Sequence, residues 1–310
     1  MPSGMAAKLD AEVTALAVRR RLAPAALVAE WVRTAQPGMA AESALADLQP
    51  DHRAYVRTQN LVSILVERLT QMPALGPVVR VVSPVQRHFA ARRGSHVPLS
   101  KSFFSYWAFF DASPTIGGET LGTCILALSA RLRLDGESIR IVRLMQNSRM
   151  GFFEWRGASG SMVRLRDLAT GDEVRAFDPV ACPGQPGQVW YTRVLPAPLR
   201  GEARHVMVTT PYIVDGVEPD DARRFIADAV AALATDGADH DAGGAAALLK
   251  YGPQPAYWPG YVLAAYRGHR TDAILLEGLP APPRARGAAR AGPRAWFPRF
   301  RARWGLGPRG

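Results

Sequence analysis

The stretch LMQNSRMGFFEW, residues 144–155, marks the point at which the chain changes from one kind of secondary structure to another. Before it, apolar residues recur every three or four positions, which is the spacing of a helix with one buried face. After it, apolar and polar residues alternate in short runs, which is the spacing of strands. The polar residues 146–149 therefore lie at a predicted boundary between a helical part and a β part.

Two segments define the helical part. In residues 51–72, DHRAYVRTQNLVSILVERLTQM, apolar side chains follow helical steps. In KSFFSYWAFFD, residues 101–111, six of the eight positions 103–110 are aromatic. A helix that is aromatic on all sides lies in a core or forms the wall of a ligand pocket. The core is favoured, because aromatic stripes pack more often than they bind.

The β part consists of five short runs between residues 150 and 214, separated by clusters of Gly, Pro, Asp and Ser. The sequence ATGDE, residues 169–173, lies between two of these runs and predicts a hairpin turn. Five short strands in this length predict a small antiparallel β-barrel, SH3-like, or a strongly curled sheet.

Helical spacing returns after residue 214. Residues 218–236 predict a helix, residues 237–247 (GADHDAGGAAA) a flexible link, and residues 257–280 at least one further helix. The predicted fold class is α+β. We expect a helical region at 1–148, the barrel at 149–215, a helical return that packs on the N-terminal half at 216–280, and a disordered Arg-rich tail at 281–310.

Several blocks in this order resemble a group of bacterial proteins to which no activity is assigned. The blocks are ETLGTCILALSARLRLDGESIRIVRLMQNSRMGFFEWRG, VRLRDLATGDE, GQPGQVWYTRVLPAPL, HVMVTTPYIVDG and YWPGYVLAAYRGHRTDAILLEGLP, within residues 119–280. The resemblance implies one structural unit over that range. It implies no ligand, cofactor or catalytic residue.

The net charge of +11 is concentrated in the tail. Residues 281–310 contain eight arginines and no acid, so +11 minus +8 leaves +3 on the first 280 residues. Arginine and aromatic side chains together suit weak contact with a nucleic acid or with an anionic membrane surface. A disordered tail shaped by genome composition is the simpler interpretation. The candidate polyanion-binding residues are Arg294, Trp296, Arg299, Arg301, Arg303 and Trp304.

The boundary stretch offers a candidate small-ligand site beside the aromatic helix. Its residues are Arg143, Gln146, Asn147, Arg149 and Glu154. The structural alternative is that Asn147 ends the helix, the next two residues satisfy its free carbonyls, and Glu154 pairs with an arginine.

Established chemistries find no support in the sequence. GASGS, residues 157–161, lacks the second glycine of a nucleophile elbow and precedes a strand. The six histidines have no paired spacing, and two isolated cysteines form no zinc motif. We therefore expect no metal and no cofactor. No apolar run reaches the roughly 18 residues of a spanning helix, and a cytoplasmic location is the default.

These observations predict a non-catalytic cytoplasmic binding or regulatory protein with weak polyanion affinity through its tail. The alternative is an enzyme of unfamiliar type whose site lies at the helix-to-sheet boundary around residues 143–154.

Overall fold

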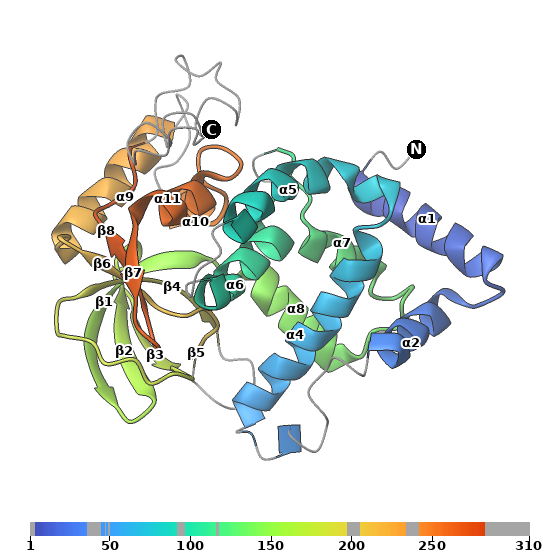
Figure 1. Cartoon of the computed structure of the whole chain (residues 1–310), viewed down its shortest axis with the longest axis horizontal. Helices are drawn as coiled ribbons and strands as arrows, with labels where there is room; N and C mark the ends of the chain where they lie inside the picture. Colours follow the sequence, from blue (N-terminus) through green and yellow to red (C-terminus); the bar gives the residue numbers. More distant parts are fainter. Residues whose placement is uncertain are drawn as a thin grey trace, which may run out of the picture.

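The computed structural model shown in Figure 1 describes residues 4–35, 45–46, 48, 50–91, 97–115, 118–196, 205–233 and 242–282. The predicted tail, with its six candidate polyanion-binding residues, lies outside the described residues except at positions 281 and 282.

The helical segments before the barrel are α1 (Met5–Arg19), α2 (Pro24–Ala35), α4 (Pro50–Leu69), η2 (Pro73–Leu75), α5 (Gly76–Ala91), α6 (Val97–Tyr106), the π-helix η3 (Trp107–Asp111), α7 (Leu121–Leu128) and α8 (Gly136–Asn147). The predicted α+β class with a helical N-terminal half is confirmed.

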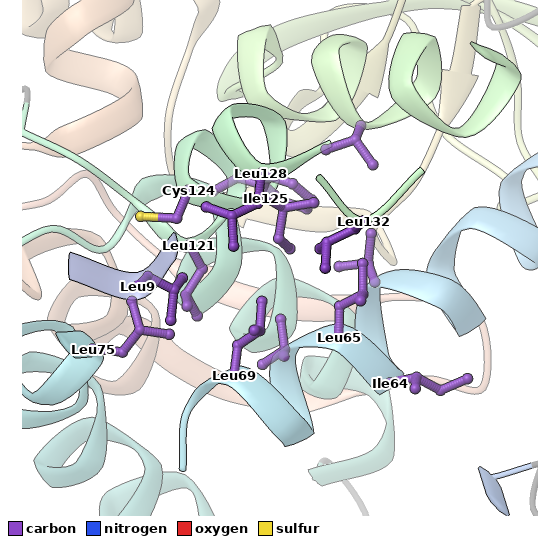
Figure 2. Close-up of a cluster of buried hydrophobic side chains, with 14 of the residues drawn as sticks. Leu9, Ile64, Leu65, Leu69, Leu75, Leu121, Cys124, Ile125, Leu128 and Leu132 are labelled. Atoms are coloured by element: carbon purple, nitrogen blue, oxygen red, sulfur yellow. The ribbon is translucent and has the colours of Figure 1, made fainter. Parts of the chain in front are cut away.

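The helical half has its own core, because α1, α4, α7 and α8 turn their apolar stripes toward one another (Figure 2). Leu9, Leu65 and Leu69 are fully buried there, and each such leucine contributes roughly 1.5–3 kcal/mol by leaving water. Cys124 lies in the same core as a small buried side chain. This core fixes the position of α8, whose end leads directly into the first strand.

The small barrel is confirmed and is closed by five strands. They are β1 (Met150–Ser159), β2 (Met162–Asp167), β3 (Glu173–Phe177), β4 (Val189–Leu195) and β5 (His205–Met207). The order is β1-β2-β3-β5-β4, and β4 pairs again with β1. Four of these pairings are antiparallel as predicted, whereas β3 and β5 pair in parallel. Because β4 lies beside β1, the strands follow a Greek-key order.

The C-terminal part differs from the prediction in two places. Its helices are α9 (Pro219–Leu233), α10 (Ala242–Tyr251) and α11 (Tyr257–Ala265). Strands β7 (Tyr266–His269) and β8 (Ile274–Glu277) follow, and β8 pairs in parallel with β6 (Tyr212–Asp215). At least one helix was expected at 257–280, and α11 confirms it. The strands β7 and β8 were not predicted, because four-residue strands carry too little periodicity to be recognised. The predicted link at 237–247 was wrong from residue 242 onward, where α10 begins.

Two groups of helices flank the barrel: α9 to α11 lie on one side of it and the N-terminal helices on another, as Figure 1 shows. Leu195 and Val206 pack into the core of the N-terminal helices. Phe152 and Tyr191 pack against α6, η3 and α9 to α11 in a second core. The C-terminal helices therefore contact the barrel as well as the N-terminal half. The outward side chains of β2 and β3 at Arg164 and Arg175 remain exposed.

No helix within the described ranges combines the length and the apolar character needed to cross a membrane.

Candidate functional site

Gln146, the first of the predicted boundary residues, is buried between helices. Its Oε1 accepts a hydrogen bond from the Thr120 hydroxyl at 2.8 Å, and its Nε2 donates to the Phe110 carbonyl at 3.2 Å. Thr120 also caps α7. The amide of Gln146 therefore joins α8 to the π-helix and to the start of α7.

The other four predicted residues do not converge. Arg149 donates to the Asp167 carboxylate at 2.8 Å. Glu154 accepts from Arg156 at 2.6 Å and lies 3.5 Å from the Arg223 guanidinium. Arg143 and Asn147 are exposed on α8.

The end of α8 agrees with the structural alternative at Asn147 and Ser148, whereas Arg149 bonds a carbonyl of β1 and not one of the helix. The helix ends at Asn147, and Ser148 Oγ donates to the Met145 carbonyl at 2.7 Å. Arg149 Nη1 donates to the Met150 carbonyl at 3.3 Å. Each buried or half-buried polar side chain of the predicted set thus has a partner within the chain.

A second candidate lies on the exposed outer side of β1, β2 and β3. Three arginines follow one another across these strands, and we call Arg156, Arg164 and Arg175 the arginine row. Arg164 stands directly opposite Arg175 in the β2–β3 register. On the other side, Arg164 stands opposite Gly157, next to Arg156. All three side chains are exposed, whereas Val163, Leu165 and Ala176 point into the barrel core.

A β-bulge brings Arg156 into this row. The register of β1 against β2 shifts between Trp155 and Gly157, which makes Arg156 the extra residue. Gly157 has φ +145°, and a Cβ there would lie 2.9 Å from Arg164 Nη2. Arg164 Nη2 donates to the Arg156 carbonyl at 3.3 Å. Glycine at 157 therefore lets the Arg164 guanidinium lie over the bulge.

The neighbouring rows show that the excess positive charge is confined to the arginine row. One neighbouring row alternates in sign, since Arg166 lies between Glu154 on β1 and Glu173 on β3. The row on the other side carries Met162 opposite Phe177. Burial lowers the pKa of His205 on the adjacent β5, which favours the neutral imidazole.

The arginine row can bind phosphate groups. Adjacent strands are about 4.8 Å apart, so the row places three guanidinium groups within about 10 Å along its base. Guanidinium groups form bidentate hydrogen bonds with phosphate. Arg156 also binds Glu154, which raises the pKa of the guanidinium, whereas Arg164 and Arg175 form no ion pair with any described residue.

Part of this surface was readable in the sequence. Arg164, Arg166 and Arg175 alternate with apolar residues in VRLRD and EVRAF, and the ATGDE turn relates the two runs. The position of Arg156 in the row depends on a β-bulge, which the sequence pattern does not predict. Among the described residues, no group of three or more His, Cys, Asp or Glu is placed to hold a metal ion.

Comparison with family models, with curated proteins and with solved structures finds no match to this chain. The resemblance over residues 119–280 therefore stays a prediction, and function is inferred from the geometry alone.

Proposed function

We propose that the chain is a non-catalytic cytoplasmic protein that binds single-stranded nucleic acid on the arginine row, with the basic tail adding affinity. The pairing of Arg164 directly opposite Arg175 carries the proposal. Like charges at directly opposite positions of an antiparallel pair are destabilising. A bound phosphate backbone would remove this repulsion and gain two charge-assisted contacts.

Nucleic acid is favoured over a membrane surface because the row lacks large exposed apolar neighbours. The large hydrophobic residues exposed among the described ones are Val18 and Val180, and neither belongs to β1, β2 or β3. Binding in a membrane interface requires an apolar face to insert. By analogy of architecture alone, five-stranded Greek-key barrels of the OB type bind oligonucleotides on the face of strands 2 and 3.

The enzymatic alternative at the boundary has less support. Its candidate residues are divided between the exposed face of α8 and separate hydrogen-bonded pairs.

The proposal is tested by Arg175→Glu, which places a carboxylate opposite Arg164. We expect the variant to be as stable as the parent or more stable by about 0.2–1 kcal/mol, because a repulsive pair becomes attractive. Its affinity for a labelled single-stranded oligonucleotide should fall. The slope of log affinity against log salt should become shallower by at least about 0.7, the value for one lost phosphate contact on a single strand. Fluorescence anisotropy over a salt series measures both quantities.

Arg143→Glu is the matched control, because it makes the same charge change at an exposed site on α8. Equal weakening by both variants would show that net charge, and not the arginine row, determines binding. Tighter binding to anionic vesicles than to the oligonucleotide would contradict a nucleic-acid ligand.

A further inference from the structure

Three charged side chains are buried together where the helical half meets the barrel. Asp111 is the last residue of the π-helix, Arg193 lies on β4, and Lys250 lies on α10. Their side chains are 3%, 0% and 9% exposed. We call them the buried charge cluster. Arg193 Nη2 donates to the two carboxylate oxygens of Asp111 at 2.6 and 2.8 Å, and Lys250 Nζ donates to Oδ1 at 2.8 Å.

The cluster has two cations for one anion. The only other acceptor recorded for both cations among the described residues is the Ser148 carbonyl, 3.0 Å from Arg193 Nη2 and 2.9 Å from Lys250 Nζ. Burial lowers the pKa of Lys250 to about 8, against the opposing effect of Asp111, and Arg193 lowers it further. At pH 7 the amine is still mostly protonated, so the cluster carries a net charge of about +1 in a medium where unpaired charge is costly.

Hydrogen-bond donors in this region are also incompletely used. All three bonds of the Arg193 guanidinium come from Nη2, while Nε and Nη1 are buried and have no partner among the described residues. The same holds for the buried hydroxyl of Tyr191. Tyr191 lies two residues before Arg193 on β4, so both side chains leave the same face of the strand, and burial raises the pKa of the Tyr191 hydroxyl.

The excess positive charge and the unpaired hydrogen-bond donors could both be satisfied by one bound group. A buried excess positive charge calls for one negative charge, and unpaired guanidinium and hydroxyl donors call for oxygen acceptors. The Tyr106 ring, whose centroid is 5.2 Å from the Arg193 guanidinium carbon, covers one face of that group. The π-helix that presents Asp111 is a rare conformation that occurs frequently at functional sites.

We propose that the buried charge cluster binds a small, singly charged oxyanion, of which a carboxylate is the simplest case. The anion would accept hydrogen bonds from the free donors of Arg193 and neutralise the charge that Lys250 contributes. It would enter on the side of Lys250, the most exposed member of the cluster. This site is independent of the arginine row, because its residues lie on other elements and face the interior.

The test is thermal unfolding of the whole chain at pH 7 in sodium formate, with sodium chloride of equal ionic strength as the reference. The unfolding midpoint should rise by about 3 °C at ten times the dissociation constant, because formate would bind only the folded state. Lys250→Met should abolish the rise while leaving Asp111 and Arg193 as a neutral pair. Arg267→Met removes an exposed ion pair with Glu277 and should leave the rise unchanged.

A second measurement keeps the proposal testable if Lys250→Met does not fold. At pH 9.5 the Lys250 amine is mostly neutral, whereas formate is still an anion, so the rise should be lost in the unaltered chain. Three outcomes would overturn the proposal: no rise beyond chloride, a rise that survives the loss of the Lys250 charge, or a rise with inorganic phosphate but not with formate.

Discussion

At the scale of single residues, the buried charge cluster shows that a single charged residue within an apolar run can mark a buried contact with a distant element. Asp111 is the single acid in KSFFSYWAFFD, Arg193 is the single charge in VWYTRVL, and Lys250 is one of three lysines in a chain with 35 arginines. Each is buried, and each has a partner of opposite charge from a distant element. Because buried charges are retained only when they are paired, such residues indicate contacts that no local pattern reveals.

The Lys250 amine should make stability depend on pH. Its pKa is about 8 in the folded protein and 10.5 in the unfolded chain. Between these values the unfolded chain holds the proton that the folded protein has released, so stability rises with pH by up to about 1.4 kcal/mol per unit. The raised pKa values of the buried cysteines act in the opposite direction above pH 9.

The effect of the Lys250 amine on stability can be separated from that of the other titratable groups by comparing the parent with a variant that lacks this amine. Lys250→Met keeps the same cysteines and tyrosines, so the difference in unfolding free energy between parent and variant cancels their contributions. In urea unfolding at pH 7, 8, 9 and 10, the unfolding free energy of the parent should increase relative to that of the variant above pH 8 only. A constant difference across this range would mean that the folded pKa of Lys250 is unshifted.

At the scale of elements, sequence patterns predicted those helices and strands whose formation depends mainly on residues close together in the chain. Alternation and the ATGDE turn located the strands of the barrel, and helical spacing located α4 and the aromatic segment. The hairpin β7–β8 escaped prediction because β8 is held by a parallel pairing with β6, some 60 residues away in sequence. α10 escaped because its alanines and glycines resemble a linker, and its helix forms only where Leu248 and Leu249 are buried.

The candidate site divides in the same way. The outward arginines of β2 and β3 follow from alternation, whereas the buried charge cluster joins three elements that only tertiary packing brings together.

The contact between α7 and the π-helix can be tested at Gly122. Replacing a helical glycine by alanine ordinarily stabilises by roughly 0.5–1 kcal/mol. Here the added Cβ would overlap the Gln146 amide oxygen and lie 2.5 Å from Phe110 Cδ1. Gly122→Ala should therefore destabilise by about 1–3 kcal/mol in urea unfolding.

The control for this contact is Gly136→Ala in the first turn of α8, where an added Cβ meets nothing within 4 Å. That variant should be as stable as the parent or more stable by up to about 1 kcal/mol. If both variants unfold at the same urea concentration, the Gln146 amide is not packed against α7 as the structure indicates.

At the scale of the whole molecule, affinity for polyanions could come from the arginine row on the barrel or from the basic tail at residues 281–310. Two helix groups pack against other parts of the barrel, through residues of β1, β4 and β5. Residues 281–310 contribute +8 of the net +11. Long-range attraction depends on net charge, whereas the salt slope counts the contacts that form. A chain that ends at residue 282 separates the two, because it loses all eight tail arginines but keeps the Ala281 carbonyl that accepts from Tyr257.

We expect this shortened chain to unfold at the same temperature as the parent and to bind a single-stranded oligonucleotide more weakly. Its salt slope should be about −2, since three arginines at about 0.7 each remain engaged. Arg175→Glu in the shortened chain should then abolish measurable binding, because Arg164 would lie opposite the new carboxylate and Arg156 is already paired with Glu154. Loss of all binding on shortening, with a steep slope in the parent, would instead assign the affinity to the tail alone and remove the arginine row from the binding surface.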